Sequence, residues 1–244
     1  MSAIAIILAR AGSKGVPGKN VAEVAGRPCI AWTIDDARAS TRVSRVVVSS
    51  DDPRALEVAR SMGVETVERP ADLAHDTATV DDAARQAFGA IGEPGGPVVI
   101  LYANVPVRPA GLVDRAIDTL VRTGADSVQS YAPVGKHHPW WTARVDMMAG
   151  NVRPWEGEVL NHGCYRRQGL PPAYIPDGGV IALTADALML RLGAEAGPHA
   201  FFGRDRRGVI TGEGEVVDID SRVDLIVADV LLREREEMES RKVG

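Results

Sequence analysis

A segment rich in glycine and basic residues runs from Leu8 to Asn20, near the start of the chain. Its glycines and proline leave the backbone free to curve around an anion, and Arg10, Lys14 and Lys19 bring three cations to one loop. This combination is typical of a site for a triphosphate. The segment is neither a Walker A loop, which needs Gly-Lys-Ser/Thr, nor a dinucleotide motif with three glycines at fixed offsets. The alternative is a solvated turn with scattered basic residues.

A pair of acidic residues near the end of the chain is a candidate metal site. The segment from Val216 to Ile219 predicts a strand, and Asp218 and Asp220 lie two residues apart at its end. Side chains two apart on a strand share a face, so both carboxylates are expected to project together while Ile219 enters the core. Two hard oxygen ligands, completed by phosphate oxygens and water, suit Mg²⁺. On its own this spacing is weak evidence, because acidic strand ends are common.

Strand-like and helix-like segments alternate along most of the chain. The run from Ala3 to Leu8 is apolar and rich in β-branched residues, as in a strand buried on both faces of a parallel sheet. Asp52 and Pro53 suit the start of a helix, and Gly63 suits its end. This alternation predicts an α/β fold with a doubly wound, mostly parallel sheet. The predicted strands are residues 3–8, 43–49, 65–68, 97–102, 127–132, 178–183 and 216–219, and the predicted helices begin near residues 28, 53, 79, 109 and 222.

The alternation stops between residues 136 and 170, a stretch that holds Trp140, Trp141 and Trp155. Tryptophans on such a segment need something to cover them. We therefore interpret the stretch as a small protruding arm, either a lid over the substrate or a dimerisation surface. We expect one domain over residues 1–244, with this arm inserted in it.

Charge and composition argue against several classes of partner. The formal net charge is −5 and its signs are interspersed, so neither nucleic acid nor an anionic membrane is favoured. The apolar run from Ala3 to Ala9 is too short to span a bilayer. Cys29 and Cys164 lie far apart and outside any metal-ligand spacing, and with no signal peptide they are interpreted as reduced thiols. These observations favour a cytoplasmic protein.

Residues 8–20 resemble the first motif of the acylneuraminate cytidylyltransferases, also called CMP-sialic acid synthetases. That motif is Leu-Ala-Arg-x-Gly-Ser-Lys-Gly-x-x-x-Lys-Asn, and the chain matches it at every fixed position. More general sugar nucleotidyltransferases share only a looser glycine loop. The resemblance implies a Rossmann-like nucleotidyltransferase fold with CTP as a substrate. It implies that the CTP phosphates are held by Arg10, Ser13, Lys14 and Lys19, and that the nucleotide site also includes Leu8, Ala9, Gly12 and Asn20.

Further matches follow in the order that the family has. The segment from Val48 to Asp52 resembles the end of the family's second strand, and residues 69–79 resemble its arginine-proline-acid-leucine-alanine segment. By this resemblance Arg69 and Thr79 contact the nucleotide. The alternatives are a surface ion pair for Arg69 and a simple helix N-cap for Thr79.

Residues 166–180 resemble the family's Arg-Gln-x-Leu-Pro segment. Arg167 aligns with the arginine that recognises the carboxylate of the sugar acid, a task that suits a planar bidentate donor. The alternative for Arg167 is an ion pair at a dimer interface. Tyr174 and Gly178 in the same segment are candidate substrate-binding residues.

Departures from the family pattern concern the sugar substrate. The family's Leu-Gln-Pro-Thr-Ser-Pro-Leu-Arg segment corresponds to residues 101–108, where Tyr102 replaces a sugar-binding glutamine. Asn104 stands near the point where octulosonate-type enzymes have a metal-binding aspartate. Asp177 and Gly179 replace an asparagine and an alanine. Tyr102 and Asn104 are therefore candidate substrate-binding residues, and we expect the side-chain end of the sugar to differ from that of N-acetylneuraminate.

Two adjacent histidines, His137 and His138, preserve a His-His-Pro sequence of the family, while Trp141 falls where a sugar-contacting lysine can occur. Paired histidines also raise the possibility of zinc, but no third ligand has suitable spacing. A structural role for His138 is favoured.

The reaction implied by the resemblance is attack by the anomeric hydroxyl of a sialic-type sugar acid on the α-phosphorus of CTP, with release of pyrophosphate. The candidate catalytic residues are Arg10 and Lys19, which would stabilise charge on the pyrophosphate, and Asp218 and Asp220, which would hold Mg²⁺. The resemblance also implies a homodimer in which the arm of one subunit reaches the active site of the other.

Other functions remain open at this stage. The nearest are cytidylyltransferases for a legionaminate, pseudaminate or octulosonate type of acid. More distant are a nucleotidyltransferase for a sugar 1-phosphate and a nucleotide-sensing module without catalysis. An NAD oxidoreductase fits the alternating strands, but the fingerprint glycines are absent.

Overall fold

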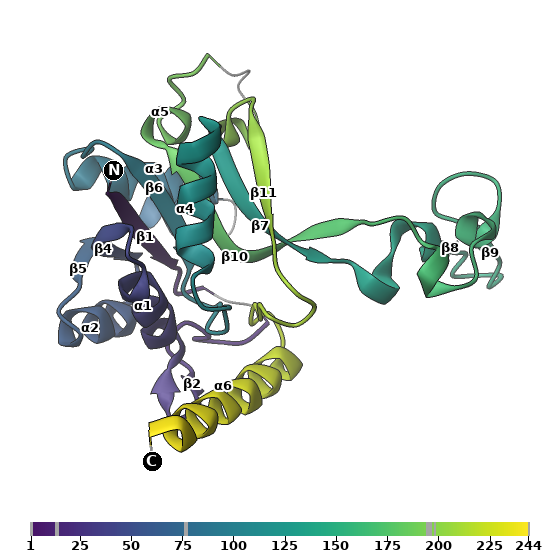
Figure 1. Cartoon of the computed structure of the whole chain (residues 1–244), viewed down its shortest axis with the longest axis horizontal. Coiled ribbons are helices and arrows are strands. Elements are labelled where there is room, and N and C mark those ends of the chain that lie inside the picture. Colours follow the sequence, from purple (N-terminus) through teal and green to yellow (C-terminus); the bar gives the residue numbers. More distant parts are fainter. Residues whose placement is uncertain (1, 13–14, 76–77, 194–196, 198, 244) are drawn as a thin grey trace.

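The computed structural model describes residues 2–12, 15–75, 78–193, 197 and 199–243. Its centre is a seven-stranded sheet with the order β11-β7-β10-β6-β1-β4-β5 (Figure 1). Neighbouring strands are parallel except at β10, which runs antiparallel to both β6 and β7. The strands are β1 (Ala3–Ala9), β4 (Val43–Ser50), β5 (Glu65–Glu68), β6 (Pro97–Tyr102), β7 (Ser127–Pro133), β10 (Tyr174–Thr184) and β11 (Arg206–Ile210).

Helices cover both faces of this sheet. Every residue of β1 is buried, and alternate side chains enter different cores: Ile7 packs with one face and Ile6 with the other. The first face carries α1 (Cys29–Ala39), α2 (Pro53–Ser61) and α4 (Leu112–Thr123), and the second carries α3 (Val80–Ala90) and α5 (Ala185–Leu188). The predicted α/β fold with a doubly wound, mostly parallel sheet is therefore confirmed.

Local signals placed several element ends correctly. The side chain of Asp52 accepts a hydrogen bond from the Arg54 backbone N–H at 3.0 Å and caps α2. Gly124, with φ 66°, ends α4 in the left-handed conformation that favours glycine. That helix begins at Leu112 rather than at Pro109, because residues 109–111 form a turn in which the Leu112 N–H donates to the Pro109 carbonyl.

The predicted strand at residues 216–219 is wrong. Only Val217 forms a bridge, an antiparallel one to Val107, and the residues on either side are irregular. The chain nevertheless alternates between buried and less buried positions, with Val217 and Ile219 inside and Asp220 exposed. A single bridge is enough to hold the segment extended without adding it to the sheet.

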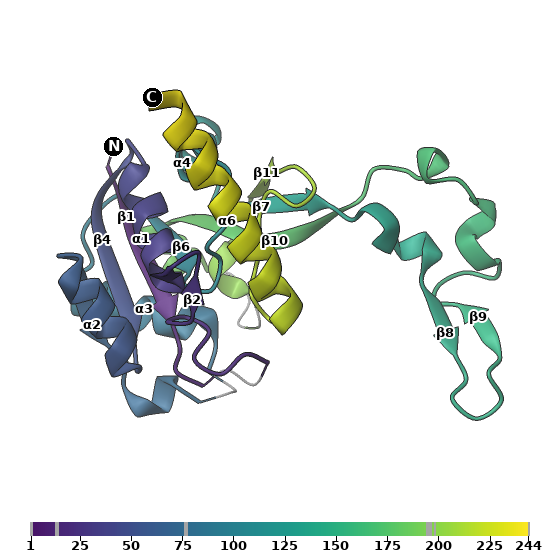
Figure 2. The ribbon, with the colours of Figure 1, turned by 90° about the horizontal axis from the view of Figure 1, so that it is seen from below.

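Residues 136–170 project from the sheet as an arm (Figures 1 and 2). The arm leaves through β7 and returns through β10, and it contains an antiparallel hairpin of β8 (Ala143–Val145) and β9 (Val152–Pro154). Trp140 stacks on His162 with ring centroids 5.0 Å apart. At the hairpin turn, Met147 and Met148 are 93% and 97% exposed. The arm therefore presents apolar side chains that nothing in the described chain covers.

The last helix, α6 (Arg222–Val243), packs against a small hairpin of β2 (Glu23–Val24) and β3 (Arg27–Pro28). Its buried residues include Ala228 and Leu232. A capping box begins this helix: the Asp224 carboxylate accepts hydrogen bonds from the backbone N–H and the hydroxyl of Ser221, and the Asp224 N–H donates to that hydroxyl at 3.4 Å. None of the helices in the described part of the chain is long and apolar enough to cross a membrane.

Candidate active site

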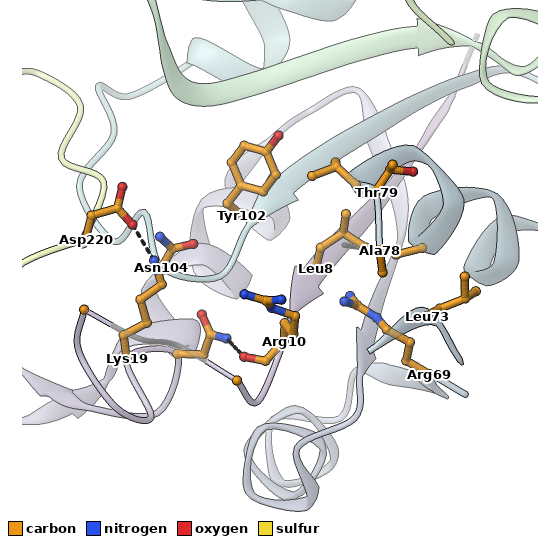
Figure 3. A pocket seen from close by; sticks show the side chains of 15 residues that line it. Leu8, Arg10, Lys19, Arg69, Leu73, Ala78, Thr79, Tyr102, Asn104 and Asp220 are labelled. Atoms are coloured by element: carbon orange, nitrogen blue, oxygen red, sulfur yellow. Dashed lines mark hydrogen bonds and ion pairs between the residues drawn. The ribbon is translucent and has the colours of Figure 1, made fainter. Parts of the chain in front are cut away.

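A cleft of about 510 Å³ opens at the carboxyl ends of β1 and β6 (Figure 3). These two strands are neighbours. After β1 the chain crosses to β4 on one side, and after β6 it crosses through α4 to β7 on the other. Open α/β sheets bind ligands at such a switch point. The cleft is lined by Leu8, Arg10, Gly12, Gly15, Lys19, Asn20, Arg69, Leu73, Ala78, Thr79, Val80, Ala83, Tyr102, Asn104 and Asp220.

The loop after β1 is tied at its beginning and at its end. The side-chain amide of Asn20 donates a 2.8 Å hydrogen bond to the carbonyl of Arg10, and the backbone N–H of Ala11 donates to the Asp51 carboxylate at 2.9 Å. Asn20 is only 5% exposed. Both ends of the loop are thus held in place, and the Arg10 side chain lies in the cleft (Figure 3). Ser13 and Lys14, two of the predicted phosphate contacts, lie outside the described residues.

The loop also contacts the acidic segment from the end of the chain. The Lys19 ammonium lies 2.6 Å from an Asp220 carboxylate oxygen (Figure 3). A Cβ added at Gly15 would lie 2.1 Å from the carbonyl oxygen of Asp220, so only glycine allows the two backbones to approach this closely. The predicted phosphate loop and the predicted metal ligands therefore belong to one site.

We expect Gly15→Ala to weaken CTP binding at least about fivefold, because the methyl group meets backbone atoms that cannot rotate away. Calorimetric titration with CTP measures this effect. Gly95→Ala is the matched control, since a Cβ at Gly95 meets nothing within 4 Å. Equal CTP affinity in the Gly15 variant and the control would show that contact between the loop and residue 220 is not needed for binding.

Asp218 lies half-buried beside the cleft and is held by Asn104. The Asn104 side-chain amide donates to the Asp218 carboxylate, and the Ile219 N–H donates to the Asn104 carbonyl at 2.9 Å. Burial, followed by the negative charge of Asp220, raises the pKa of Asp218 to about 6. Asn104 therefore contacts a predicted metal ligand and also lines the cleft.

The donor set fits Mg²⁺ bound together with a phosphate ligand. Asp218 and Asp220 are hard oxygen donors, and the charge of Asp220 disfavours the ionised form of Asp218, a repulsion that a divalent cation would relieve. Within the described residues, no group of three or more His, Cys, Asp and Glu side chains is arranged to hold a metal. The remaining ligands would have to come from substrate and water, as Mg²⁺ commonly requires.

Arg69 is a buried cation at the other end of the cleft. It is 7% exposed, donates to the Ser49 carbonyl at 3.2 Å, and its Nε has no hydrogen-bond partner among the described residues. Burial lowers its pKa, and the nearby charge of Arg10 acts in the same direction. Two neighbouring guanidinium groups, one with an unsatisfied N–H, favour an anionic or oxygen-rich ligand. A surface ion pair, the alternative for Arg69, does not fit this burial.

Thr79 is a helix N-cap, and its predicted contact with the nucleotide stays a prediction. Its hydroxyl accepts from the backbone N–H of Asp82 at 3.2 Å and so caps α3, and its side chain also lines the cleft (Figure 3). Ala9 is fully buried, and its carbonyl accepts from the Ser50 hydroxyl at 2.6 Å. Ala9 therefore belongs to the buried end of β1 and does not line the cleft.

Tyr102 and Gly178 lie near Asp218. A Cβ at Gly178 would lie 3.3 Å from an Asp218 carboxylate oxygen and 3.6 Å from the Tyr102 ring. Burial raises the pKa of Tyr102 to about 12, so its phenol stays neutral and can donate a hydrogen bond. We call this part of the site, formed by Tyr102, Asn104, Gly178 and Asp218, the acceptor end.

Two predicted substrate-binding residues lie away from the cleft of their own chain. Arg167 is in the arm, exposed, and forms a 2.8 Å ion pair with Glu213. Tyr174 is 46% exposed at the start of β10. Neither lines the cleft. Their predicted roles would require another subunit or a movement of the arm.

His138 has a structural position. It is 4% exposed, its Nδ1 accepts from the Trp140 backbone N–H, and its Nε2 contacts the Pro171 carbonyl at 3.1 Å. Both ring nitrogens of His138 therefore already have hydrogen-bond partners, which disfavours a role as a zinc ligand.

Two residues with evident roles in the site were not among the predicted ones. Asp51 accepts from the phosphate loop, and Arg108 is a fully buried cation behind the acceptor end. The only sequence signal for either was its place in a segment that resembles the family, since neither has a neighbour of diagnostic spacing.

Comparison with known proteins agrees with this geometry. The family model described as cytidylyltransferase matches residues 4–144. An N-acylneuraminate cytidylyltransferase of Streptococcus agalactiae serotype III (strain NEM316) is 29% identical over all of the chain, which spans 58% of that protein's length. A CMP-N,N'-diacetyllegionaminic acid synthase of Legionella pneumophila is 29% identical over 97% of the chain and 99% of its own.

A solved structure shares the fold. It is CMP:2-keto-3-deoxy-manno-octonic acid synthetase complexed with CTP, which superposes with a TM-score of 0.72 over 96% of the chain and 100% of its own, at 16% sequence identity. The matched family model covers β1, its glycine loop and the other strands up to β7, and so includes most of the residues that line the cleft. The chain belongs to the cytidylyltransferase family.

Proposed function

We propose that this chain is an enzyme that transfers CMP from CTP to the anomeric hydroxyl of a nonulosonic, sialic-type sugar acid and releases pyrophosphate. One observation carries the proposal: Arg10 and Lys19 of the glycine loop, the buried Arg69 and the Asp220 carboxylate line a single cleft. Asp218 lies beside this cleft, hydrogen-bonded to the lining residue Asn104. A nucleoside triphosphate, a divalent cation and an acceptor need these three kinds of group together.

The chemistry needs no covalent nucleophile from the protein. Arg10 and Lys19 stabilise negative charge on the departing pyrophosphate, while Arg69 binds the nucleotide. The hydrogen bond from Asn104 holds the Asp218 carboxylate in its place within the acceptor end. Mg²⁺ held by Asp218 and Asp220 would neutralise phosphate charge and make the acceptor hydroxyl more acidic. The protein's share of the acceleration is then positioning and charge stabilisation.

The acceptor acid is the least determined part of the proposal. A legionaminate-type acid is the second candidate, because the Legionella pneumophila relative matches nearly all of both chains. Tyr102, which stands where sialate enzymes have glutamine, fills part of the acceptor end with an aromatic ring. This substitution favours an acceptor with a less polar side chain than N-acetylneuraminate.

Pyrophosphate release against a panel of acids tests the proposal. Wild-type protein is incubated with Mg²⁺, CTP and each of several nonulosonic and octulosonic acids, and then with ATP, GTP or UTP in place of CTP. We expect release only with CTP and with at least one nonulosonic acid. CTP binding without release from any acid would favour a non-catalytic nucleotide-binding module, and activity with a sugar 1-phosphate would replace the proposed acceptor class.

We further propose a homodimer in which the arm, residues 136–170, lies against the partner subunit near its cleft. The exposed Met147, Met148, Trp155 and Tyr165 need a covering surface, and Arg167 on the same arm lies outside the cleft of its own chain. An enzyme that consumes CTP is expected in the cytoplasm.

Sedimentation velocity at micromolar concentration tests this assembly. We expect the mass of two chains for the wild type. In the variant that carries both Met147→Asp and Met148→Asp, a shift towards the monomer is expected, because charges at an apolar interface are poorly solvated. A monomeric wild type would contradict the proposed role of the arm.

A further inference from the structure

Arg108 is a buried cation immediately behind the cleft. It is 3% exposed, and its charge is balanced by Asp36 on α1, 3.3 Å from its Nη1. Burial lowers the pKa of Arg108, while Asp36 acts in the opposite direction. A guanidinium buried this completely is stable only if its N–H groups are all directed at acceptors. The positions of these hydrogen-bond acceptors therefore show which segments Arg108 holds together.

One set of acceptors belongs to the loop that follows β6. Nη2 of Arg108 donates to the Tyr102 carbonyl at 3.0 Å, and Nη1 donates to the Val105 carbonyl and to the Thr33 hydroxyl. The Thr33 hydroxyl in turn donates to the Val105 carbonyl at 3.0 Å. Arg108 and Thr33 therefore fix the backbone on both sides of Asn104.

The other hydrogen-bond acceptor belongs to a β-bulge within β10, where the register with β7 shifts between Pro176 and Ile181. Nε of Arg108 donates to the Gly179 carbonyl at 2.6 Å, and the Gly179 N–H donates to the Asp177 carboxylate at 2.9 Å. A Cβ at Gly179 would lie 2.9 Å from the side chains of Leu112 and Ser130. The backbone at Gly179 is thus closely packed, and this packing fixes the direction of its carbonyl. Arg108 donates the hydrogen bond that this carbonyl accepts.

Both segments carry parts of the acceptor end. Asn104 on the first donates to Asp218, and Gly178 on the second lies against the same carboxylate. The guanidinium is planar and rigid, so its bonds to the two segments fix the distance between them. The Asp218 carboxylate is held between these segments.

We infer that Arg108 is a positioning residue that sets the spacing of the acceptor end and the direction of the Asp218 carboxylate. The inference rests on the proposed function only for the identity of the acceptor. The hydrogen bonds of Arg108 go to Thr33, Asp36, Tyr102, Val105 and Gly179. We therefore expect its effect to be on use of the sugar acid rather than on nucleotide binding.

Arg108→Lys is the test variant, because lysine keeps the positive charge but has one nitrogen in place of the planar fork. We expect the sugar-acid KM to rise, or kcat to fall, by at least about tenfold, with the Kd for CTP changed by less than about threefold. Arg45→Lys is the matched control, because Arg45 also binds its partner, Glu65, with two N–H groups but lies on the surface. In the control, the sugar-acid KM, kcat and the Kd for CTP should all stay at their wild-type values.

Thr33→Val keeps the inference testable if Arg108→Lys folds poorly. It removes only the hydroxyl that Arg108 and the Val105 carbonyl share, and it should shift the acceptor parameters in the same direction by about threefold or more. A loss of CTP affinity that matches the loss of acceptor use would mean general destabilisation and would overturn the inference. So would wild-type kinetics in both variants.

Amide hydrogen exchange separates this inference from the proposed function. Arg108→Lys should raise exchange in residues 102–105 and 178–180 and leave residues 8–12 unchanged, whether or not a sugar acid is turned over. If the wild type releases no pyrophosphate but exchange follows this pattern, the proposed function fails and the positioning role stands. Uniform exchange changes, or none, would overturn the positioning role itself.

Discussion

Asp218→Asn and Asp220→Asn are each expected to remove most activity, by about a hundredfold or more, while the protein remains folded. Both carboxylates belong to the proposed metal site, and an asparagine there is a neutral and weaker ligand for Mg²⁺. The phosphate loop can still hold CTP, so CTP binding should weaken far less than turnover. A rate assay and a CTP titration on each variant measure the two effects separately.

The stability of the ligand-free variants distinguishes a metal-binding role from a structural one. The pKa of Asp218 is raised to about 6, so at pH 7 its carboxylate is ionised in the folded protein and destabilises the fold relative to the unfolded chain, where the pKa is lower. Asp218→Asn removes this charge and should melt at or slightly above the wild-type temperature at pH 7. Asp220→Asn loses the ion pair with Lys19, but Asp220 is 75% exposed, so the change should be small. Melting far below wild type in both variants would make the aspartates structural.

Lys19→Ala and Arg10→Ala are each expected to lower turnover at least tenfold, which corresponds to roughly 1.4 kcal/mol of transition-state stabilisation. Each variant removes a cation from the cleft where pyrophosphate would leave. Steady-state rates with saturating CTP measure the effect, and Arg122→Ala, an exposed arginine on α4, is the control. Wild-type rates in either cleft variant would remove that residue from the mechanism.

Lys19 should show a second effect, because it pairs with Asp220 in the absence of ligand. In Lys19→Ala, Asp220 loses the cation that neutralises it and becomes more available to a divalent ion. Binding of Mn²⁺ without nucleotide is therefore expected to tighten, while CTP binding weakens. Opposite signs for the two ligands would distinguish loss of this ion pair from general damage to the loop.

Sequence patterns predicted the sheet well where the signal is local. Apolar β-branched runs, helix caps such as Asp52 and stop signals such as Gly63 depend only on neighbouring residues. The antiparallel direction of β10 and the strand β11 were not predicted, because strand pairing depends on residues far apart in the chain. The strand predicted at residues 216–219 fails for the same reason: its pattern is strand-like, but among these residues only Val217 forms a β-bridge, while the Ile219 N–H donates to the Asn104 carbonyl in a loop.

In the candidate site, too, local patterns were predicted and contacts between distant residues were not. Residues 8–20 are contiguous in the sequence, and their types and spacing alone predicted a phosphate site. The contact between Lys19 and Asp220 joins residues 201 positions apart, and Asn104 contacts Asp218 across 114 positions. No periodicity indicates such contacts. The functional hypothesis came from the resemblance to a family, whereas only the folded structure shows that these residues lie close together.

The mass of the product tests the central claim most directly. Wild-type protein is incubated with CTP, Mg²⁺ and the acid that gives most pyrophosphate, and the mixture is analysed by mass spectrometry. The account predicts a conjugate with the mass of CMP plus the acid minus one water, formed in equal amount to pyrophosphate. Pyrophosphate accompanied by free CMP, with no conjugate formed under conditions where CMP-sugar standards are stable, would contradict it.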